Sequence, residues 1–190
     1  MKINVRNNCG LTLIELMVSL SVLAILLGLA VPSYRTFIQS TRLTAITNDL
    51  ASALATARSE AVKRATRVTV CKSANVNAAS PTCSAVANWQ DGWIVFVDGS
   101  VAGTVDGTDA ANVLRVFQPT VINGMAIDGG VNFDDWVSYM ASGVSRGSGD
   151  LPNGTFVVDF ATCPSPATNM ARNVVINNTG RVTVQRINCT

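Results

Sequence analysis

The feature that most constrains this chain is a run of 21 residues, 11–31, in which Glu15 is the only charged residue. A helix that rises about 1.5 Å per residue makes such a run about 32 Å long, enough to cross a hydrocarbon core of about 30 Å. Lys2 and Arg6 precede the run without an acid, so the positive-inside rule keeps residues 1–10 in the cytoplasm. We therefore expect one membrane-spanning helix followed by an extracytoplasmic domain.

Three interpretations of this run compete. It can be a secretory signal that is cut after Gly28-Leu29-Ala30, whose small residues fit such a processing site, or an anchor that is never cut. The third interpretation starts from Glu15, because a carboxylate within an apolar span is costly and is usually paired or functional. An ordinary signal core has no use for such a residue.

The residues around Glu15 carry a resemblance. The sequence Gly10-Leu11-Thr12-Leu13-Ile14-Glu15 resembles the cleavage and methylation site of type IV prepilins and pseudopilins. The resemblance implies that residues 1–10 are a leader, that a prepilin peptidase cuts between Gly10 and Leu11, and that Leu11, where the family usually has phenylalanine, becomes N-methylated. Glu15 would then be the assembly glutamate. Because an unpaired carboxylate is costly among packed apolar helices, we expect Glu15 to pair with the Leu11 amine of an adjacent subunit.

Helical spacing of apolar residues continues after this run. One stripe predicts that the helix extends to about residue 67 and packs on its own domain. The stripe consists of Phe37, Leu43, Ile46, Leu50, Leu54, Ala57 and Ala61. The basic residues Arg58, Lys63, Arg64 and Arg67 lie largely off the stripe and are interpreted as a solvated face.

Beyond the helix the pattern changes to short β-prone runs separated by turn residues. Strands are predicted at residues 67–72, 92–98, 112–117, 155–160, 172–176 and 181–188. Residues 98–109 and 141–153 are predicted loops, and 177–180 a hairpin turn in which Gly180 can take a positive φ. The fold class is therefore α+β, with a long amino-terminal helix packed on a mostly antiparallel sheet, and residues 32–190 form the periplasmic globular domain.

Several blocks in this domain carry a second resemblance. They are Ala57-Arg58-Ser59-Glu60-Ala61, Val68-Thr69-Val70-Cys71, the run from Trp89 to Asp98, and Gly180-Arg181-Val182. Together they are similar to the GspH/FimT group of minor pseudopilins. The resemblance implies a type IV pilin-like fold and a minor pilin in the priming or tip complex of a type IV pilus, or else a minor pseudopilin of a type II secretion system. The implied partners are the prepilin peptidase, other minor and major pilins and, before assembly, the inner membrane.

Composition excludes several chemistries. The chain has no histidine, which removes Ser-His-Asp and Cys-His catalysis and every histidine-based zinc site. Nothing resembles an activated nucleophile or a paired acid and base, so we expect no enzyme and no cofactor. The aspartates in 98–109 and at 134–135 could bind calcium, but their spacing misses the D-x-D-x-D-G loop, so a metal site is not expected.

Cysteine usage predicts disulfides. Five cysteines become four if the leader with Cys9 is removed, and four thiols in the periplasm allow three connectivities. We favour Cys71–Cys83 and Cys163–Cys189, because each closes a short loop. No C-x-x-C motif supports zinc binding instead.

Charge is segregated along the chain. Residues 73–159 carry a net charge of −7, whereas residues 160–190 carry Arg172, Arg181 and Arg186 with no acid. Some members of the group that act in DNA uptake have Gly-Arg-x-Arg in the last hairpin, and Thr183 stands here at the second arginine position. The three arginines are candidate phosphate contacts for weak, salt-sensitive DNA binding. The alternative is a basic edge that discourages strand pairing.

Overall fold

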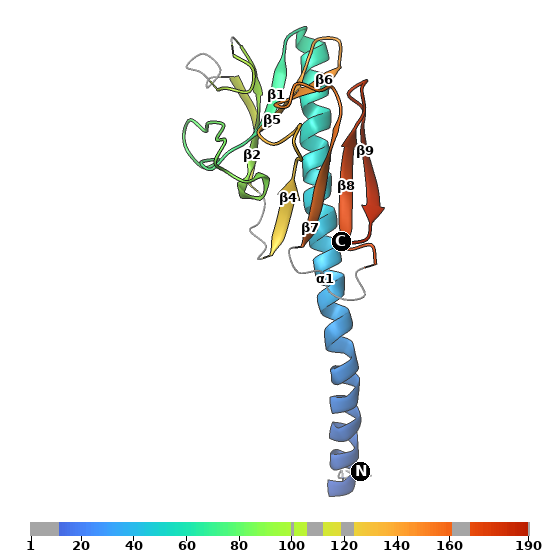
Figure 1. The fold of residues 1–190 in the computed structure, drawn as a ribbon. Helices are drawn as coiled ribbons and strands as arrows, with labels where there is room; N and C mark the ends of the chain where they lie inside the picture. The colour runs from blue at the N-terminus through green and yellow to red at the C-terminus, as the bar shows by residue number, and fades with distance from the viewer. Residues whose placement is uncertain (1–11, 100, 106–111, 119–123, 161–167, 190) are drawn as a thin grey trace, which may run out of the picture. The chain divides into compact units, whose positions relative to one another are not determined.

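The structure, a computed structural model, describes residues 12–99, 101–105, 112–118, 124–160 and 168–189, and for residues 29–33 and 35 it describes the backbone alone. One long helix, α1 (Leu13–Arg64), precedes all the strands (Figure 1). The strands are β1 (Val68–Lys72), β2 (Trp93–Val97), β3 (Val113–Phe117), β4 (Met125–Asp128), β5 (Trp136–Tyr139), β6 (Ser145–Gly147), β7 (Gly154–Phe160), β8 (Ala171–Ile176) and β9 (Val182–Ile187). A short 3₁₀ helix, η1 (Trp89–Asp91), precedes β2.

The chain divides into two compact units, residues 1–41 and 42–190. The first unit contains the amino-terminal part of α1, and every described side chain from Thr12 to Gly28 is exposed there. Leu13, Ile14 and Ile25 are each more than 60% exposed, at 77%, 66% and 65%. Among the described residues, none of the helices has both the length and the apolar character that a membrane crossing requires.

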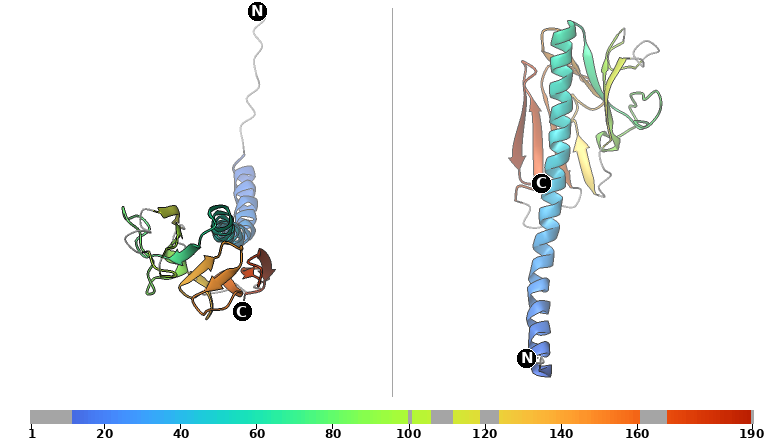
Figure 2. Two further views of the ribbon diagram at one scale, coloured as in Figure 1. Left: turned by 90° about the horizontal axis from the view of Figure 1, so that it is seen from above. Right: turned by 180° about the vertical axis from the view of Figure 1, so that it is seen from behind.

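The second unit has two antiparallel sheets. Five strands form one sheet in the order β3-β2-β1-β5-β6, and four form the other in the order β4-β7-β8-β9. Seen from behind, α1 lies in front of the four-stranded sheet (Figure 2). The predicted α+β fold, a long helix packed on antiparallel β-structure, is thus confirmed, with the strands divided between two sheets instead of one.

The helix contributes one face to a single large core. The stripe residues Leu43, Ile46, Leu50, Leu54, Ala57 and Ala61 are all at most 4% exposed, and they pack with apolar side chains from both sheets. Phe37 does not continue the stripe, because it is 65% exposed and belongs to the first unit. The same core cluster contains buried apolar side chains from β1, β2, β4, β5, β7 and β8.

The helix ends slightly earlier than the sequence predicts. Ala65 has a φ of 51°, and the Thr66 amide donates to the carbonyl of Ala61 at 3.2 Å. A bond from the residue after a left-handed residue back into the last turn is the Schellman motif, in which glycine is usual because a Cβ is disfavoured there. The absence of glycine at this position explains why the sequence predicted a helix to about residue 67.

The predicted strands match β1, β2, β3, β7, β8 and β9 within a few residues. The 177–180 turn joins β8 to β9 as predicted, and Gly180 has a φ of 76°. Three strands were missed, β4, β5 and β6, and the predicted loop 141–153 is corrected because β6 lies inside it. These strands have three or four residues each, too few for a clear alternation of apolar and polar side chains.

Candidate functional site

The start of α1 is arranged around Thr12 and Glu15. The Glu15 amide donates to Thr12 Oγ1 at 3.3 Å, and the Leu16 amide donates to the Thr12 carbonyl at 3.2 Å. Thr12 is therefore an N-cap, and Glu15 lies in the first turn, where a negative charge interacts favourably with the helix dipole. Glu15 is exposed, and its carboxylate forms no ion pair with any other described residue. Within the described part of the chain, this carboxylate is thus open to a partner.

The residues of the predicted cleavage site, Gly10 and Leu11, lie outside the described residues. Cleavage between them, methylation of Leu11 and pairing of Glu15 with a neighbouring amine therefore stay predictions.

The structure contains the first predicted disulfide. Cys71 in β1 is bonded to Cys83, which confirms this pairing. The bond fixes the intervening segment against the five-stranded sheet, where Cys71 is buried with Val76, Ile94 and Phe96. Cys189 is disulfide-bonded as well, but Cys163, its predicted partner, lies outside the described residues, so that pairing stays a prediction.

The three arginines proposed for phosphate contact do not share one surface. Arg172 in β8 is 4% exposed, and its Nη1 donates to the carbonyls of Asn169 and Ala171 at 2.6 and 2.9 Å. Arg186 pairs in register with Arg172 across the two strands. Burial, together with the charge of Arg186, lowers the pKa of the Arg172 guanidinium. Arg172 is thus engaged inside the protein rather than presented to a ligand.

Arg181 lies at the other end of β9. It precedes the strand, and five residues of extended chain separate it from Arg186 by about 16 Å. Both arginines are exposed. DNA contact by Arg181 or Arg186 stays a prediction, but the structure does not bring the two side chains into one cluster.

Arg181 instead borders a groove with residues from α1. The groove, which we call the basic groove, has a volume of about 610 Å³ and is lined by the helix, the turn Ser142-Gly143 and the start of β9. Arg58, Lys63 and Arg181 are the charged residues of its lining, and Ala55, Val62 and Val182 supply apolar surface. The charged residues that line the groove are therefore all positive, and Glu60, 3.6 Å from Lys63, lies outside its lining.

Arg58 holds the walls of the basic groove together. Its Nε donates to the Gly143 carbonyl at 3.0 Å and its Nη2 to the Thr179 carbonyl at 2.9 Å. Gly143 follows β5 in the five-stranded sheet, whereas Thr179 lies in the β8–β9 turn of the other sheet. One side chain on the helix thus links turns from both sheets.

The expectation of a solvated basic face is therefore wrong for two of its four residues. Arg58 is engaged as described, and Arg67 forms an ion pair at 3.0 Å with Asp98, whose side chain is fully buried. Lys63 and Arg64 are more exposed and pair with Glu60 on the helix surface, as a solvated face predicts. The hydrogen bond from Arg64 is the main cause that lowers the pKa of Glu60.

Asp98 organises the end of β2. Besides Arg67, its carboxylate accepts hydrogen bonds from the Thr69 hydroxyl and from the Gly103 amide, the latter at 2.9 Å. Arg67 and Thr69 lie at the start of β1, and Gly103 lies in the segment after β2. A buried charge with this many partners is well compensated, and it fixes the beginning of the loop after β2.

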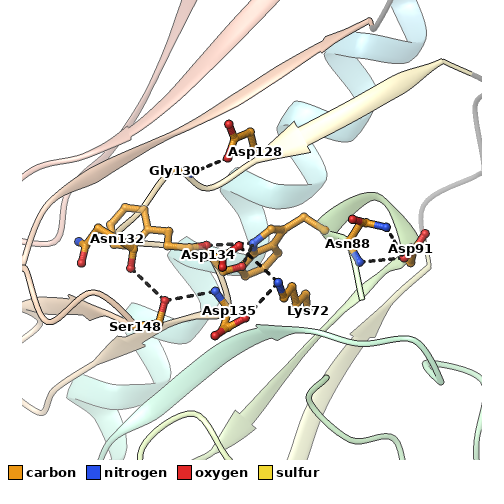
Figure 3. Close-up of polar contacts among 11 residues, drawn as sticks. Lys72, Asn88, Asp91, Asp128, Gly130, Asn132, Asp134, Asp135 and Ser148 are labelled. Carbon is orange, nitrogen blue, oxygen red and sulfur yellow. Dashed lines mark hydrogen bonds and ion pairs between the residues drawn. The ribbon is translucent and has the colours of Figure 1, made fainter. Parts of the chain in front are cut away.

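A second polar cluster surrounds Lys72, beside Asp134 and Asp135 (Figure 3). Lys72 Nζ lies 3.0 Å from Asp135 and 3.4 Å from Asp134, and Trp89 Nε1 donates to the carbonyls of Phe133 and Asp134 at 2.9 and 2.8 Å. The ammonium of Lys72 offsets the two carboxylates that the sequence suggested for calcium. No group of three potential metal ligands occurs among the described residues.

Sequence reasoning missed the roles of Arg58, Arg67, Asp98 and Lys72. Gly103 is five positions from Asp98, but the side-chain contacts that join distant segments span 29 to 121 positions, so local pattern could not reveal them. The sequence signal that could have pointed to Arg58 and Asp98 is their position in two blocks that resemble the GspH/FimT group, Ala57-Arg58-Ser59-Glu60-Ala61 and the run from Trp89 to Asp98. The resemblance alone did not reveal what these two residues contact.

The family model described as "Type II transport protein GspH" matches residues 47–180, most of the chain. The chain belongs to the GspH family. A second model, the prokaryotic N-terminal methylation motif, matches residues 5–31 and so includes Gly10, Leu11 and Glu15. The GspH match extends from α1 to Gly180 and includes Arg58, Asp98 and both cysteines of the observed disulfide.

The fold is also similar to that of a solved structure. The crystal structure of the Pseudomonas aeruginosa PAO1 type IV minor pilin FimU in space group P2₁ matches this GspH-family chain with a TM-score of 0.53 and 17% identity. The match covers 78% of this chain and 92% of FimU. A second FimU crystal form, P6₅, gives a TM-score of 0.49 at 16% identity, with 75% and 91% coverage. A comparison with curated proteins found no match.

Proposed function

We propose that this protein is a minor pilin of a type IV pilus that is cleaved after Gly10, N-methylated on Leu11 and incorporated at the priming or tip complex. The observation that carries the proposal is the N-terminal methylation motif over residues 5–31, which precedes the GspH-family match over residues 47–180. The similarity to FimU, a type IV minor pilin, supports the pilus over other assemblies. Before assembly the protein would lie in the inner membrane, with its amino terminus in the cytoplasm and its globular domain in the periplasm.

The proposed mechanism of incorporation depends on Glu15. Every described apolar side chain in the first two turns of α1 is exposed, so this part of the helix needs apolar neighbours. Among such neighbours a carboxylate without a partner costs several kcal/mol. The Leu11 amine that cleavage creates on an adjacent subunit would neutralise it, which couples processing to assembly.

The experiment compares Glu15→Ala with Asp49→Ala in the native host. Both changes remove one exposed acid from α1, but Asp49 lies in the second unit, far along the helix from the cleavage site. We expect Glu15→Ala to remain in the membrane fraction and to be strongly depleted from sheared filaments, and Asp49→Ala to be incorporated normally. Normal incorporation of Glu15→Ala would refute this role for Glu15.

A second candidate is a minor pseudopilin of a type II secretion system. The description of the matching family model, a type II transport protein, favours it. Deletion of the gene followed by separate assays of twitching motility, transformation and exoprotein release distinguishes the candidates. The pilus proposal predicts loss of twitching with normal exoprotein release, and the opposite result would favour the secretion system. Loss of transformation with twitching intact would instead favour a DNA-uptake pilin.

A further inference from the structure

The basic groove has two cationic side chains, Lys63 and Arg181, that other described residues engage weakly or not at all. Lys63 has a 75% exposed side chain and lies 3.6 Å from Glu60, a weak surface pair. The Arg181 side chain has no hydrogen bond or ion pair with another described residue. Arg58, by contrast, uses Nε and Nη2 to join two turns. The groove therefore combines a wall held by Arg58 with two cations available to a ligand.

The lining also indicates that the ligand has an apolar group besides negative charge. Val62 is 53% exposed at the groove, and Ala55 and Val182 extend the apolar surface beside it. A phosphate or a sugar-phosphate backbone would leave this surface exposed to water. A peptide segment that carries an apolar side chain between carboxylates would cover it and would pair with both cations.

Charge complementarity within a filament points the same way. The described aspartates Asp91, Asp128, Asp134 and Asp150 are all exposed, and none of them lines the basic groove. Residues 73–159 of this chain carry a net charge of −7, so a neighbouring subunit with a similar charge distribution would bring carboxylates to a groove whose charged lining residues are all positive.

We propose that the basic groove docks an acidic segment of a neighbouring pilin subunit, with an apolar side chain against Val62 and carboxylates on Lys63 and Arg181. The proposal rests on the proposed function only for the identity of the partner as a filament subunit. Binding of an acidic peptide tests the groove directly, and it can succeed or fail independently of the deletion phenotypes above.

The experiment measures fluorescence anisotropy of a short fluorescein-labelled peptide that alternates glutamate and leucine, with the full chain in non-ionic detergent. The expected result is saturable binding that weakens as salt rises. Lys63→Gln and Arg181→Gln should each weaken binding about two- to fivefold, the range of an exposed ion pair, and more together. Ala55→Trp, which fills the groove without changing charge, should abolish it.

Two matched control variants distinguish binding in the basic groove from nonspecific attraction of the acidic peptide to a positively charged protein. Arg64→Gln removes a cation one residue from Lys63, and Arg186→Gln removes an arginine from the far end of β9; neither residue lines the groove. Binding should be unchanged in both, and far-UV circular dichroism should be unchanged in all variants. Equal losses in the controls, undiminished binding to Ala55→Trp, or equal binding of a glutamine-leucine peptide would overturn the proposal. Duplex DNA that binds more tightly than the peptide and depends on the same residues would overturn the assignment of the partner.

Discussion

Arg58→Gln should destabilise the second unit by much more than an ordinary surface arginine would. The guanidinium of Arg58 joins the carbonyls of Gly143 and Thr179, which belong to turns of different sheets. The two turns touch closely, because a Cβ on Gly180 would lie 2.1 Å from the Gly143 carbonyl oxygen. Glutamine is too short to reach both carbonyls, so the link between the turns would be lost.

The magnitude follows from the surroundings of the two bonds. A hydrogen bond from a charged donor contributes about 1.5–3 kcal/mol, and the bond to Gly143 is partly buried. The bond to Thr179 is exposed to solvent and therefore contributes less, about 0.5–1 kcal/mol. The expected loss is therefore about 2–4 kcal/mol, or about 4–16 °C in Tm for a domain of about 150 residues. Arg58→Lys, which can keep one bond, should lie between the wild type and Arg58→Gln.

The assay is thermal unfolding of the full chain in detergent, followed by near-UV circular dichroism, which reports the buried tryptophans. Arg64→Gln is the control, because Arg64 is an exposed arginine on the same helix that bonds only Glu60 at 2.6 Å. An exposed pair of this kind contributes little to stability, so this variant should lower Tm only slightly. If Arg58→Gln lowers Tm no more than Arg64→Gln does, the link between the sheets is not what Arg58 provides.

Three further predictions concern the same unit. Asp98→Ala should lower the free energy of unfolding in urea by about 3–5 kcal/mol, because Thr69 and Arg67 would lose the buried carboxylate that they bond. A decrease below about 1 kcal/mol would contradict this. Burial, and secondarily the charge of Asp128, raise the pKa of Asp159, so its folded carboxyl holds a proton more tightly than the unfolded one. Asp159→Asn should therefore raise Tm at neutral pH, with a gain that shrinks as pH falls through the raised pKa and is gone below the ordinary aspartate range; a gain independent of pH would disprove this cause. Replacing both Cys71 and Cys83 with serine should lower the free energy of unfolding by about 3 kcal/mol. A reductant should lower the Tm of the wild type but not that of a triple variant in which Cys71, Cys83 and Cys189 are all serine.

The fold was largely accessible from sequence because its main elements have regular patterns. The stripe from Leu43 to Ala61 predicted which face of α1 is buried, and β-branched residues in β1, β2, β7, β8 and β9 predicted those strands. The strands β4, β5 and β6 were not predicted because they are short and lie among glycines and aspartates. Gly147 shows why such residues are there, since a Cβ would lie 2.1 Å from the Asn132 carbonyl oxygen.

The candidate site was accessible only in part. The motif around Glu15 is contiguous, so sequence alone could identify it, and the family match agrees. The basic groove is assembled from residues that the fold brings together over more than 100 positions, from Ala55 to Val182. Arg172 shows the opposite error, because a cation in a strand suggested a surface contact, whereas its guanidinium bonds backbone carbonyls inside the protein.

The most direct test of this account is mass spectrometry of the amino terminus of the native protein, isolated from membranes and from sheared filaments. The account predicts a chain that begins with N-methylated Leu11 in both fractions and retains Glu15. A chain that begins at Val31 would show that the apolar helix is removed as a signal, and it would contradict assembly through that helix.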